Sequence, residues 1–352
     1  MRKIIYLIVG MLILLPINIT ALNVTASSAI LMDIDSNRIL YAKDIHNIRS
    51  VASISKIMTA VLAIESGKLD EVVTIGDEID LAYGSGIYIQ KGEQMSLRDL
   101  VYGLMLRSGN DAAYAIAEYV GGDEFVQMMN NKASEIGMIN TTFNNPCGLD
   151  EKEGNYSTAY DMALLTSYAM KIDEYKKITG TKFYKLKTNK NFYLWHNKHK
   201  LLGKYNYITG GKTGYTKKAL RTLVTTATKN DLNLVAVTLN DGNDFSDHNE
   251  MFEYAFENYV NVIIQPQGII NIYDKVYYGL FDLSIDKDIR YPLKKDDKVF
   301  LKFLLDKKTH EGNIGNVTLF INDKEVLNEN INATKKASSK SNNVIDWIEK
   351  IW

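Results

Sequence analysis

Apolar and polar positions follow two different periods along the chain and divide it into regions. The segment 27–44, SSAILMDIDSNRILYAKD, holds two short strand-like apolar runs around a D-S-N turn, which predicts a β-hairpin. From about Ser53 to Lys177, apolar residues recur at helical spacing, with breaks at glycine-rich turns. From about 182, β-branched residues and turn residues predict successive antiparallel strands, and an amphipathic helix follows at 247–260. Strands at both ends with helices between them predict one α+β domain whose sheet is completed by distant parts of the chain.

The pattern of apolar and polar residues changes after about residue 265. Short alternating segments predict a small all-β domain over 265–333, followed by a polar linker at 334–343. In the tail, 344–352, the apolar residues fall on one helical face and the charged residues fall off it. With the lysines upstream, this pattern is typical of a short amphipathic helix on an anionic membrane surface, so we expect weak or reversible attachment. A frayed or self-docking C-terminus is the alternative.

The N-terminus reads as a targeting segment. Arg2 and Lys3 precede the apolar run IIYLIVGMLILLP, which has the length of a signal-peptide core and is short for a membrane span. Small residues at Ala21 and Ala26 offer cleavage positions, so we assign 1–26 to a signal peptide and 27–262 to the α+β domain. An uncleaved anchor is the alternative, and either reading predicts export to the extracytoplasmic side of the membrane.

Charge and cysteine content exclude several classes of function. The 352 residues carry a formal net charge of −1, so no basic excess is available to neutralise nucleic-acid phosphates. The single cysteine excludes an internal disulfide framework and removes the usual thiolate zinc sites. The five histidines are scattered, apart from an H-x-x-H pair at His196 and His199, so we expect neither a metal nor an organic cofactor.

The segment 52–67, ASISKIMTAVLAIESG, carries the first candidate chemistry. On a helix, residues three apart share a face, so Ser53 and Lys56 would stand side by side. A serine hydroxyl becomes a good nucleophile when a neighbouring base takes its proton, and a lysine can do so once burial or nearby cations lower its pKa. The alternative is a helix cap beside a solvated lysine. A second S-x-x-K at Ser284 to Lys287 lies in the β-rich part and is read as coincidence.

Two further motifs change this balance. RSGNDAA gives Ser108 and Asn110 in an S-x-N arrangement, and GGKTGYT gives Lys212, Thr213 and Gly214. S-x-x-K with S-D-N and K-T-G is a signature of penicillin-binding proteins and class A β-lactamases, and here the middle motif is S-G-N. Here the three motifs occur in the expected order: at a helix start, in an inter-helix loop and on a strand after a glycine pair. A turn and a hairpin end are the plain alternatives for the second and third.

The sequence resembles the serine-type D-alanyl-D-alanine carboxypeptidases, the low-molecular-mass penicillin-binding proteins of peptidase family S11. The resemblance rests on ASISKIMTA, LRDLVYGLMLRSGNDAAYAIAEYVGG, MNNKASEIGMINTTFNNPCGLD, YSTAYDMALL and GGKTGYT, in family order over about 27–260. It implies a β-lactamase/transpeptidase-like fold, an antiparallel sheet with a helix cluster, followed by a small all-β domain. The substrates implied are peptidoglycan stem peptides, with β-lactam antibiotics as inhibitors.

The resemblance implies a role for each motif residue. Ser53 would attack the terminal D-Ala-D-Ala peptide bond and form an acyl-enzyme, Lys56 would be the general base, and Ser108 would relay a proton to the leaving D-alanine. Asn110 would orient Lys56 and hydrogen-bond the substrate. The K-T-G strand and the residue after it would bind the substrate and its terminal carboxylate. They would also complete an oxyanion hole with the backbone N–H of Ser53. These residues are Lys212, Thr213, Gly214 and Tyr215.

Some positions depart from the family pattern. Leu220 stands where many relatives have a glycine, and Asp244 lies near the position of an arginine that helps some members bind the substrate carboxylate. This pattern resembles a subgroup found in spore-forming bacteria, so the spore wall is one setting for the expected cell-wall role. Cys147, in NPCGLD, lacks a base partner in sequence and is interpreted as structural.

Two rival functions remain open from the sequence. A β-lactamase would share the fold and the nucleophile and would need an added glutamate; Glu151 and Asn155 match an E-x-x-x-N spacing, but within a block that resembles the carboxypeptidases. The other rival is a catalytically inactive envelope-binding protein that keeps the fold as a scaffold. The intact motif residues argue against that interpretation.

Overall fold

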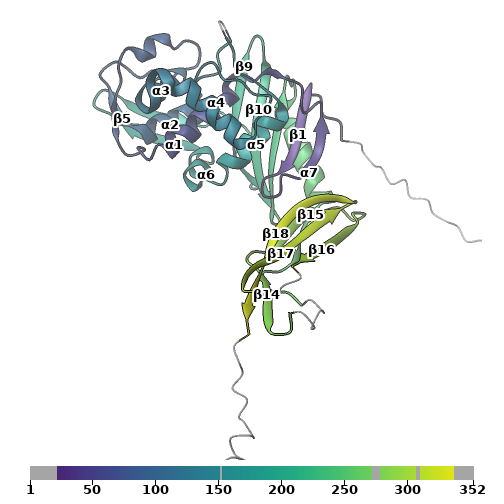
Figure 1. Ribbon diagram of the computed structural model, residues 1–352. Coiled ribbons are helices and arrows are strands. Elements are labelled where there is room, and N and C mark those ends of the chain that lie inside the picture. The colour runs from purple at the N-terminus through teal and green to yellow at the C-terminus, as the bar shows by residue number, and fades with distance from the viewer. Residues whose placement is uncertain (1–21, 151–152, 272–277, 307–309, 337–352) are drawn as a thin grey trace, which may run out of the picture.

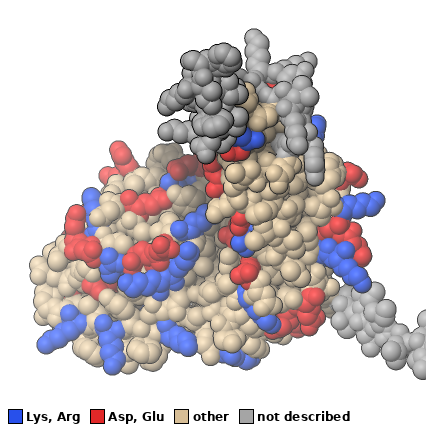
Figure 2. Space-filling model, turned by 90° about the horizontal axis from the view of Figure 1, so that it is seen from below, with Lys and Arg blue, Asp and Glu red and all other residues tan. Residues whose placement is uncertain are grey.

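The computed structural model describes residues 22–150, 153–271, 278–306 and 310–336 (Figure 1). Most of the predicted signal peptide and the predicted amphipathic tail lie outside these ranges. None of the helices within the described ranges has the length and apolar character needed to cross a bilayer. Acidic and basic side chains are interspersed over the face seen from below (Figure 2), as expected for a chain with a net charge of −1.

A five-stranded antiparallel sheet forms the centre of the larger domain, in the order β2-β1-β11-β10-β9. The predicted hairpin is confirmed, and its strand β1 pairs with β11, from near the far end of the domain, in the register Ser28↔Leu239 to Asp33↔Leu234. The sheet is therefore closed by distant segments, as the strand pattern predicts. The strands are β1 (Ser28–Asp33), β2 (Ile39–Lys43), β9 (Ile208–Thr216), β10 (Leu220–Lys229) and β11 (Leu232–Leu239).

The central strands are buried on both faces because the sheet separates two hydrophobic cores. In β1, Ile30 and Met32 join the core shared with the helix cluster, whereas Ala29 and Leu31 join the core under α7. This alternation follows from the two-residue period of a strand. Helix α7 (Asp244–Asn258) covers the second face with Met251, Phe252 and Ala255, and the other helices cover the first (Figure 1).

Six α-helices make up the cluster on the first face of the sheet. The chain is less helical here than the pattern predicts, because 66–96 and 137–158 hold short strands, turns and one 3-10 helix. These two stretches carry glycines and small polar residues, and the second also carries Pro146; these residues interrupt the helical period. The helices are α1 (Lys56–Glu65), α2 (Leu97–Arg107), α3 (Asn110–Gly121), α4 (Phe125–Ile136), α5 (Ala159–Ala169) and α6 (Asp173–Thr179), with the 3-10 helices η1 (Ala52–Ser55), η2 (Asp77–Leu81) and η3 (Gly122–Glu124).

Three two-stranded ribbons border the larger domain. The strands expected from about residue 182 begin with a hairpin that stays separate from the main sheet. Its Trp195 is buried in the core shared with the helix cluster, so the hairpin packs on the helices. The ribbons are β3 (Arg49–Ser50) with β6 (Tyr156–Ser157), β4 (Val72–Thr74) with β5 (Gln94–Ser96), and β7 (Phe183–Lys187) with β8 (Phe192–His196).

The C-terminal part is a small β domain with a core of its own, which confirms the predicted fold class. Strand β12 crosses the predicted boundary at 262–265 and pairs with β15, and β18 runs into the segment predicted to be linker. A five-stranded sheet follows the order β13-β14-β18-β17-β16. The strands are β12 (Val260–Gln265), β13 (Gly268–Ile269), β14 (Phe281–Ile285), β15 (Ile289–Leu293), β16 (Val299–Leu305), β17 (Gly312–Ile321) and β18 (Lys324–Lys335).

Arg38, at the turn of the first hairpin, connects the two domains. Its Nη1 lies 2.8 Å from a carboxylate oxygen of Asp297, and its guanidinium carbon lies 5.3 Å from the ring centroids of both Tyr259 and Tyr291. The side chains of Arg38 and Asp297 are 14% and 6% exposed. This ion pair is largely shielded from solvent and links the small domain to the sheet end of the larger one.

Residues 22–26, at the end of the predicted signal peptide, pack against the larger domain. Val24 and Ala26 are buried in the core under α7, and the backbone N–H of Thr25 donates to Asp247 over 2.6 Å. Of the two cleavage positions that the sequence offers, one at Ala21 keeps these contacts and one at Ala26 removes them.

Candidate active site

Ser53 lies in a tight turn between the sheet and the helix cluster. Helix α1 begins only at Lys56, so Ser53 belongs to the preceding 3-10 turn, and its hydroxyl caps no helix. Ala52 adopts a left-handed conformation with φ of 50°, which costs a residue with a Cβ on the order of 1 kcal/mol. The hydroxyl of Thr222 on β10 donates to the carbonyl of Val51 over 3.0 Å and ties this turn to the sheet.

Lys56 is fully buried beside Ser53, and its ammonium group is enclosed by three oxygen acceptors. Its Nζ lies 3.0 Å from Ser53 Oγ and 2.7 Å from Asn110 Oδ1, and it also donates to the carbonyl of Cys147. Burial, together with the positive charge of Lys198, lowers the pKa of Lys56 to about 8. The solvated lysine considered from the sequence is therefore wrong, and about one-tenth of this lysine is neutral at pH 7 by simple titration.

The loop 144–150 supplies the carbonyl that contacts Lys56. Asn145 Oδ1 accepts from the backbone N–H groups of Cys147 and Gly148, at 3.2 and 2.6 Å, so one side chain holds this turn in place. Gly148 has φ of +80°, and a Cβ there would lie 2.1 Å from the carbonyl oxygen of Ala52. The loop therefore fits against the Ser53 turn only with glycine at this position. Cys147 is buried, which agrees with the structural interpretation.

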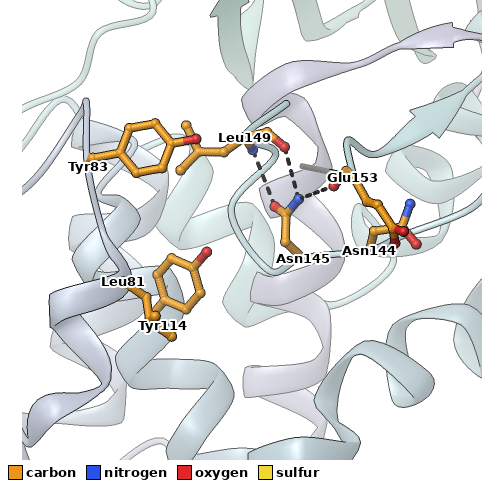
Figure 3. Close-up of a pocket in the computed structure, with 7 residues that line it drawn as sticks. All are labelled: Leu81, Tyr83, Tyr114, Asn144, Asn145, Leu149 and Glu153. Atoms are coloured by element: carbon orange, nitrogen blue, oxygen red, sulfur yellow. Dashed lines mark hydrogen bonds between the residues drawn. The ribbon is translucent and has the colours of Figure 1, made fainter. Parts of the chain in front are cut away.

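The same loop also lines a pocket of about 440 Å³ beside the Ser53 region (Figure 3). Leu81, Tyr83 and Tyr114 line one side of it, and Asn145 faces them with its amide donating to the carbonyls of Leu149 and Glu153, at 2.9 and 3.1 Å. Tyr83 also contacts the candidate site residues, because its backbone carbonyl accepts a hydrogen bond from the side-chain amide of Asn110. The pocket thus shares a wall with the environment of Lys56.

Ser108 and Asn110 occupy the turn between α2 and α3. Helix α2 starts at a capping box, in which Ser96 and Asp99 satisfy each other's backbone N–H, and ends at Ser108 in a left-handed conformation with φ of 63°. Helix α3 begins at Asn110, only two residues later. This sharp turn aims both side chains at the Ser53 region, and both residues are nearly fully buried.

Lys212 approaches from β9, the edge strand of the sheet. Its Nζ donates to Ser108 Oγ over 2.9 Å and to the carbonyl of Thr213 over 2.7 Å. Burial and the positive charges of Lys56 and Lys198 lower the pKa of Lys212 well below its usual value. Two buried lysines therefore flank Ser53 and Ser108, and the charge of Lys56 disfavours the charged form of Lys212.

Gly214 lets β9 come close to the nucleophile turn. A Cβ at this position would lie 2.3 Å from Thr222 Oγ1 and 3.1 Å from the backbone nitrogens of Ser53 and Ile54. Within the described residues β9 is an edge strand, so backbone groups on its outer side near Gly214 are open to pairing with an extended ligand.

A cleft of about 430 Å³ opens over these residues. Of the residues predicted from sequence, it is lined by Ser53, Ser108, Thr213, Gly214 and Tyr215, while Lys56, Asn110 and Lys212 lie beneath it. All eight predicted site residues therefore meet in one place.

Several residues of the site escaped the sequence prediction. The cleft is also lined by Ser85, Lys198, Lys200, Arg221 and Phe245, which come from two loops, strand β10 and helix α7 and share no motif. Asn145 escaped as well, since its contribution is to hold a backbone carbonyl. The sequence offered one signal only: Asp244, singled out as a departure from the family, also lines the cleft.

The secondary sequence matches lie elsewhere or act structurally. Ser284 lies on β14, and Lys287 next to it pairs with Glu329 at 2.8 Å, so this S-x-x-K is incidental. Asn155 is buried, and its side chain bonds the backbone of Asn144 and Asn145. Glu151 falls outside the described residues. Among those that are described, no group of three or more His, Cys, Asp or Glu side chains could hold a metal ion.

Sequence comparison finds a family match over most of the larger domain. The family model described as D-alanyl-D-alanine carboxypeptidase matches residues 17–243. The chain is 37% identical to the D-alanyl-D-alanine carboxypeptidase DacF of Bacillus subtilis over 247 residues, which cover 66% of this chain and 63% of that protein. It is 30% identical to DacD of Escherichia coli over 343 residues, covering 86% of this chain and 84% of the relative.

Solved structures extend the similarity into the C-terminal domain. Penicillin binding protein 5 from Haemophilus influenzae superposes with a TM-score of 0.77 at 27% identity, covering 90% of this chain and 99% of that one. A D-alanyl-D-alanine carboxypeptidase from Mycobacterium tuberculosis covers 67% of this chain and 92% of its own, with a TM-score of 0.64 at 29% identity.

Proposed function

Because the chain belongs to the D-alanyl-D-alanine carboxypeptidase family of serine hydrolases, we propose that it removes the terminal D-alanine from peptidoglycan stem pentapeptides through an acyl-enzyme on Ser53. The observation that carries this proposal is the 3.0 Å contact between Ser53 Oγ and the buried Nζ of Lys56, inside a cleft that the other motif residues line or underlie. A serine next to a lysine of lowered pKa is suited to acyl transfer without a metal.

In the acylation step, neutral Lys56 takes the hydroxyl proton while Ser53 Oγ attacks the carbonyl of the penultimate D-alanine. Asn110 accepts from Lys56 Nζ over 2.7 Å and keeps it aimed at the hydroxyl. The backbone N–H groups of Ser53 and Tyr215 stabilise the oxyanion, because such donors are most effective where negative charge develops. Gly214, which brings β9 against the Ser53 turn, sets the separation between these two donors.

Collapse of the tetrahedral intermediate breaks the C–N bond and expels D-alanine. The leaving nitrogen needs a proton. Ser108 relays to it the proton that Lys56 took from Ser53, so Lys56 becomes neutral again; Lys212 Nζ lies 2.9 Å from the Ser108 hydroxyl. Lys212 also faces the terminal carboxylate of the substrate, whose negative charge favours the charged form of this lysine, and the Thr213 hydroxyl contacts the same carboxylate from the cleft. A water molecule then hydrolyses the ester, releasing the shortened stem peptide and regenerating Ser53.

A β-lactam fits the same chemistry as a slow substrate. Attack by Ser53 opens its strained amide and leaves a penicilloyl ester, so we expect penicillin to label and inhibit the protein. The stem peptides that the enzyme acts on lie outside the cytoplasm, which agrees with the leader that the N-terminal sequence predicts. The amphipathic tail remains a proposed membrane contact.

D-alanine release from a synthetic pentapeptide, measured with and without prior penicillin treatment, tests the proposal. We expect release by the wild-type protein, loss of release after penicillin, and loss in Ser53→Ala. Rapid hydrolysis of penicillin with no release of D-alanine from the peptide would instead identify a β-lactamase. A folded protein that neither releases D-alanine nor hydrolyses penicillin would instead be an inactive binding protein.

A further inference from the structure

Arg221 places a guanidinium group at the wall of the cleft. It lies on β10 directly opposite Tyr215 of β9, so both side chains project from the same face of the sheet edge. Its side chain is 43% exposed, and both residues line the same cleft as Ser53 and Thr213. A cation is therefore presented to a ligand lying along the outer edge of the K-T-G strand.

Asp244, at the first residue of α7, holds this guanidinium from behind. Arg221 Nε donates to Asp244 Oδ2 over 3.0 Å, and Nη2 donates to Oδ1 of the same carboxylate. The carboxylate is only 6% exposed, so it lies on the protein side of the pair. The ring of Phe245 lies 5.7 Å from the guanidinium carbon and adds a second support.

The bidentate pair leaves donors for a ligand. A guanidinium carries five N–H groups in a fixed plane, and Asp244 occupies two of them. The remaining three include an edge that can bind a carboxylate in the planar geometry typical of arginine. The positive charge of Arg221 is balanced by Asp244, but Lys198 and Lys200 also line the cleft and keep its field favourable to an anion.

We propose that Arg221, oriented by Asp244, is the specificity residue that binds the terminal carboxylate of the substrate. This inference rests on the proposed function, because it names the group that recognises the peptide end released as D-alanine. It also accounts for the departure at Asp244. Where some relatives have an arginine just before the closing helix, this chain has an acid that positions an arginine from the neighbouring strand.

Two peptides that differ only at the carboxylate test the proposal. One ends in D-Ala-D-Ala with a free carboxylate, and the other is its C-terminal carboxamide, which removes the negative charge and keeps the scissile bond. We expect wild type to prefer the acid, and Arg221→Gln to reduce kcat/KM for the acid by roughly 10- to 100-fold, the usual effect of losing a charge-assisted hydrogen bond. The value for the amide should change little, so the acid-to-amide preference collapses.

Asp244→Asn tests the positioning part with the same readout. It keeps the shape of the side chain and weakens the grip on Arg221, so we expect a smaller loss confined to the acid and expressed mainly in KM. Arg290→Gln is the matched control, because Arg290 is 45% exposed and paired with Asp288 in the small domain. Its acid-to-amide preference should equal that of wild type.

The outcomes separate the two claims. If Arg221→Gln lowers kcat/KM equally for the acid and the amide peptide, or keeps the acid-to-amide preference of wild type, the role of Arg221 is overturned. D-alanine release by wild type in the same experiment would still support the proposed function. No release of D-alanine by folded wild type overturns the proposed function, and the inference falls with it. If Arg221→Gln does not fold, Asp244→Asn gives the decision: an unchanged acid-to-amide preference in that variant contradicts the proposal.

Discussion

The Nζ of Lys56 lies 3.0 Å from the Oγ of Ser53, and the lysine is completely buried. A charged lysine in this position is disfavoured by lost hydration, and a neutral lysine can accept the serine proton. The same burial that makes Lys56 resemble a core residue therefore suits it to the proposed role of base.

The rate of acylation should follow the deprotonation of Lys56. Burial lowers the pKa of Lys56 to about 8, and only the neutral form can act as the base. The second-order rate constant for acylation by penicillin should therefore rise with pH through about 8 and then level off. Stopped-flow or gel-based labelling between pH 6 and pH 10 measures it. A rate that is flat or falls over this interval would contradict the assignment of Lys56 as base.

Asn110→Asp should move this profile to higher pH. The substitution keeps the contact at 2.7 Å to Lys56 Nζ and replaces a neutral acceptor by an anion. An opposite charge at this distance raises a lysine pKa by about 1 to 3 units, so acylation at pH 7 should fall and the midpoint should rise. A slower variant with an unshifted midpoint would show that Asn110 acts on the substrate alone.

Gly148→Ala should disturb both stability and acylation. The new Cβ would lie 2.1 Å from the carbonyl oxygen of Ala52, and φ of +80° is already unfavourable for alanine. We expect a loss of roughly 2 kcal/mol or more in the free energy of unfolding and slower acylation, because the loop must move away from the Ser53 turn.

Gly137→Ala is the matched control for this steric effect. Gly137 has φ of +88°, and nothing lies within 4 Å of the position of an added Cβ. The substitution there carries only the cost of placing alanine at a positive φ, about 1 kcal/mol in the free energy of unfolding, and the rate of acylation should be unchanged. Equal effects of the two substitutions in chemical denaturation and in penicillin labelling would refute the close approach at Gly148.

Arg38→Ala should weaken the attachment of the small domain. The substitution leaves Asp297 buried without its partner and removes the stacking on Tyr259 and Tyr291, at a cost of roughly 3 kcal/mol. Calorimetry should show the small domain unfolding at a lower temperature, ahead of the larger domain. Arg290→Ala, which removes an exposed ion pair, should cost at most about 1 kcal/mol. Indistinguishable scans for the two variants would contradict the interdomain role of Arg38.

Much of the fold follows from local patterns in the sequence. The short apolar runs of β1 and β2, the turn between them and the β-branched residues of β9 to β11 all predict the strands that form. The pattern also predicts that distant segments complete the sheet. It overestimates helix in 66–96 and 137–158, because the apolar residues there anchor loops on the core without any regular period.

The site divides in the same way between local and long-range information. Ser53, Lys56, Ser108, Asn110 and Lys212 carry motifs whose spacing reflects a local turn or strand. Arg221 and Asp244 are 23 residues apart in sequence and meet only through the packing of α7 on the sheet, which no local pattern encodes. Sequence reasoning therefore finds Asp244 as an exception and misses its partner.

The central claim is that Ser53 carries the acyl group, and peptide mapping of the penicillin-treated protein by mass spectrometry tests it most directly. Trypsin releases residues 50–56, which contain Ser50, Ser53 and Ser55, so fragmentation of this peptide must locate the adduct. We predict one penicilloyl group on Ser53, an equal yield in Ser55→Ala and none in Ser53→Ala. An adduct on Ser50, Ser55 or Ser108, or labelling that persists in Ser53→Ala, would contradict the account.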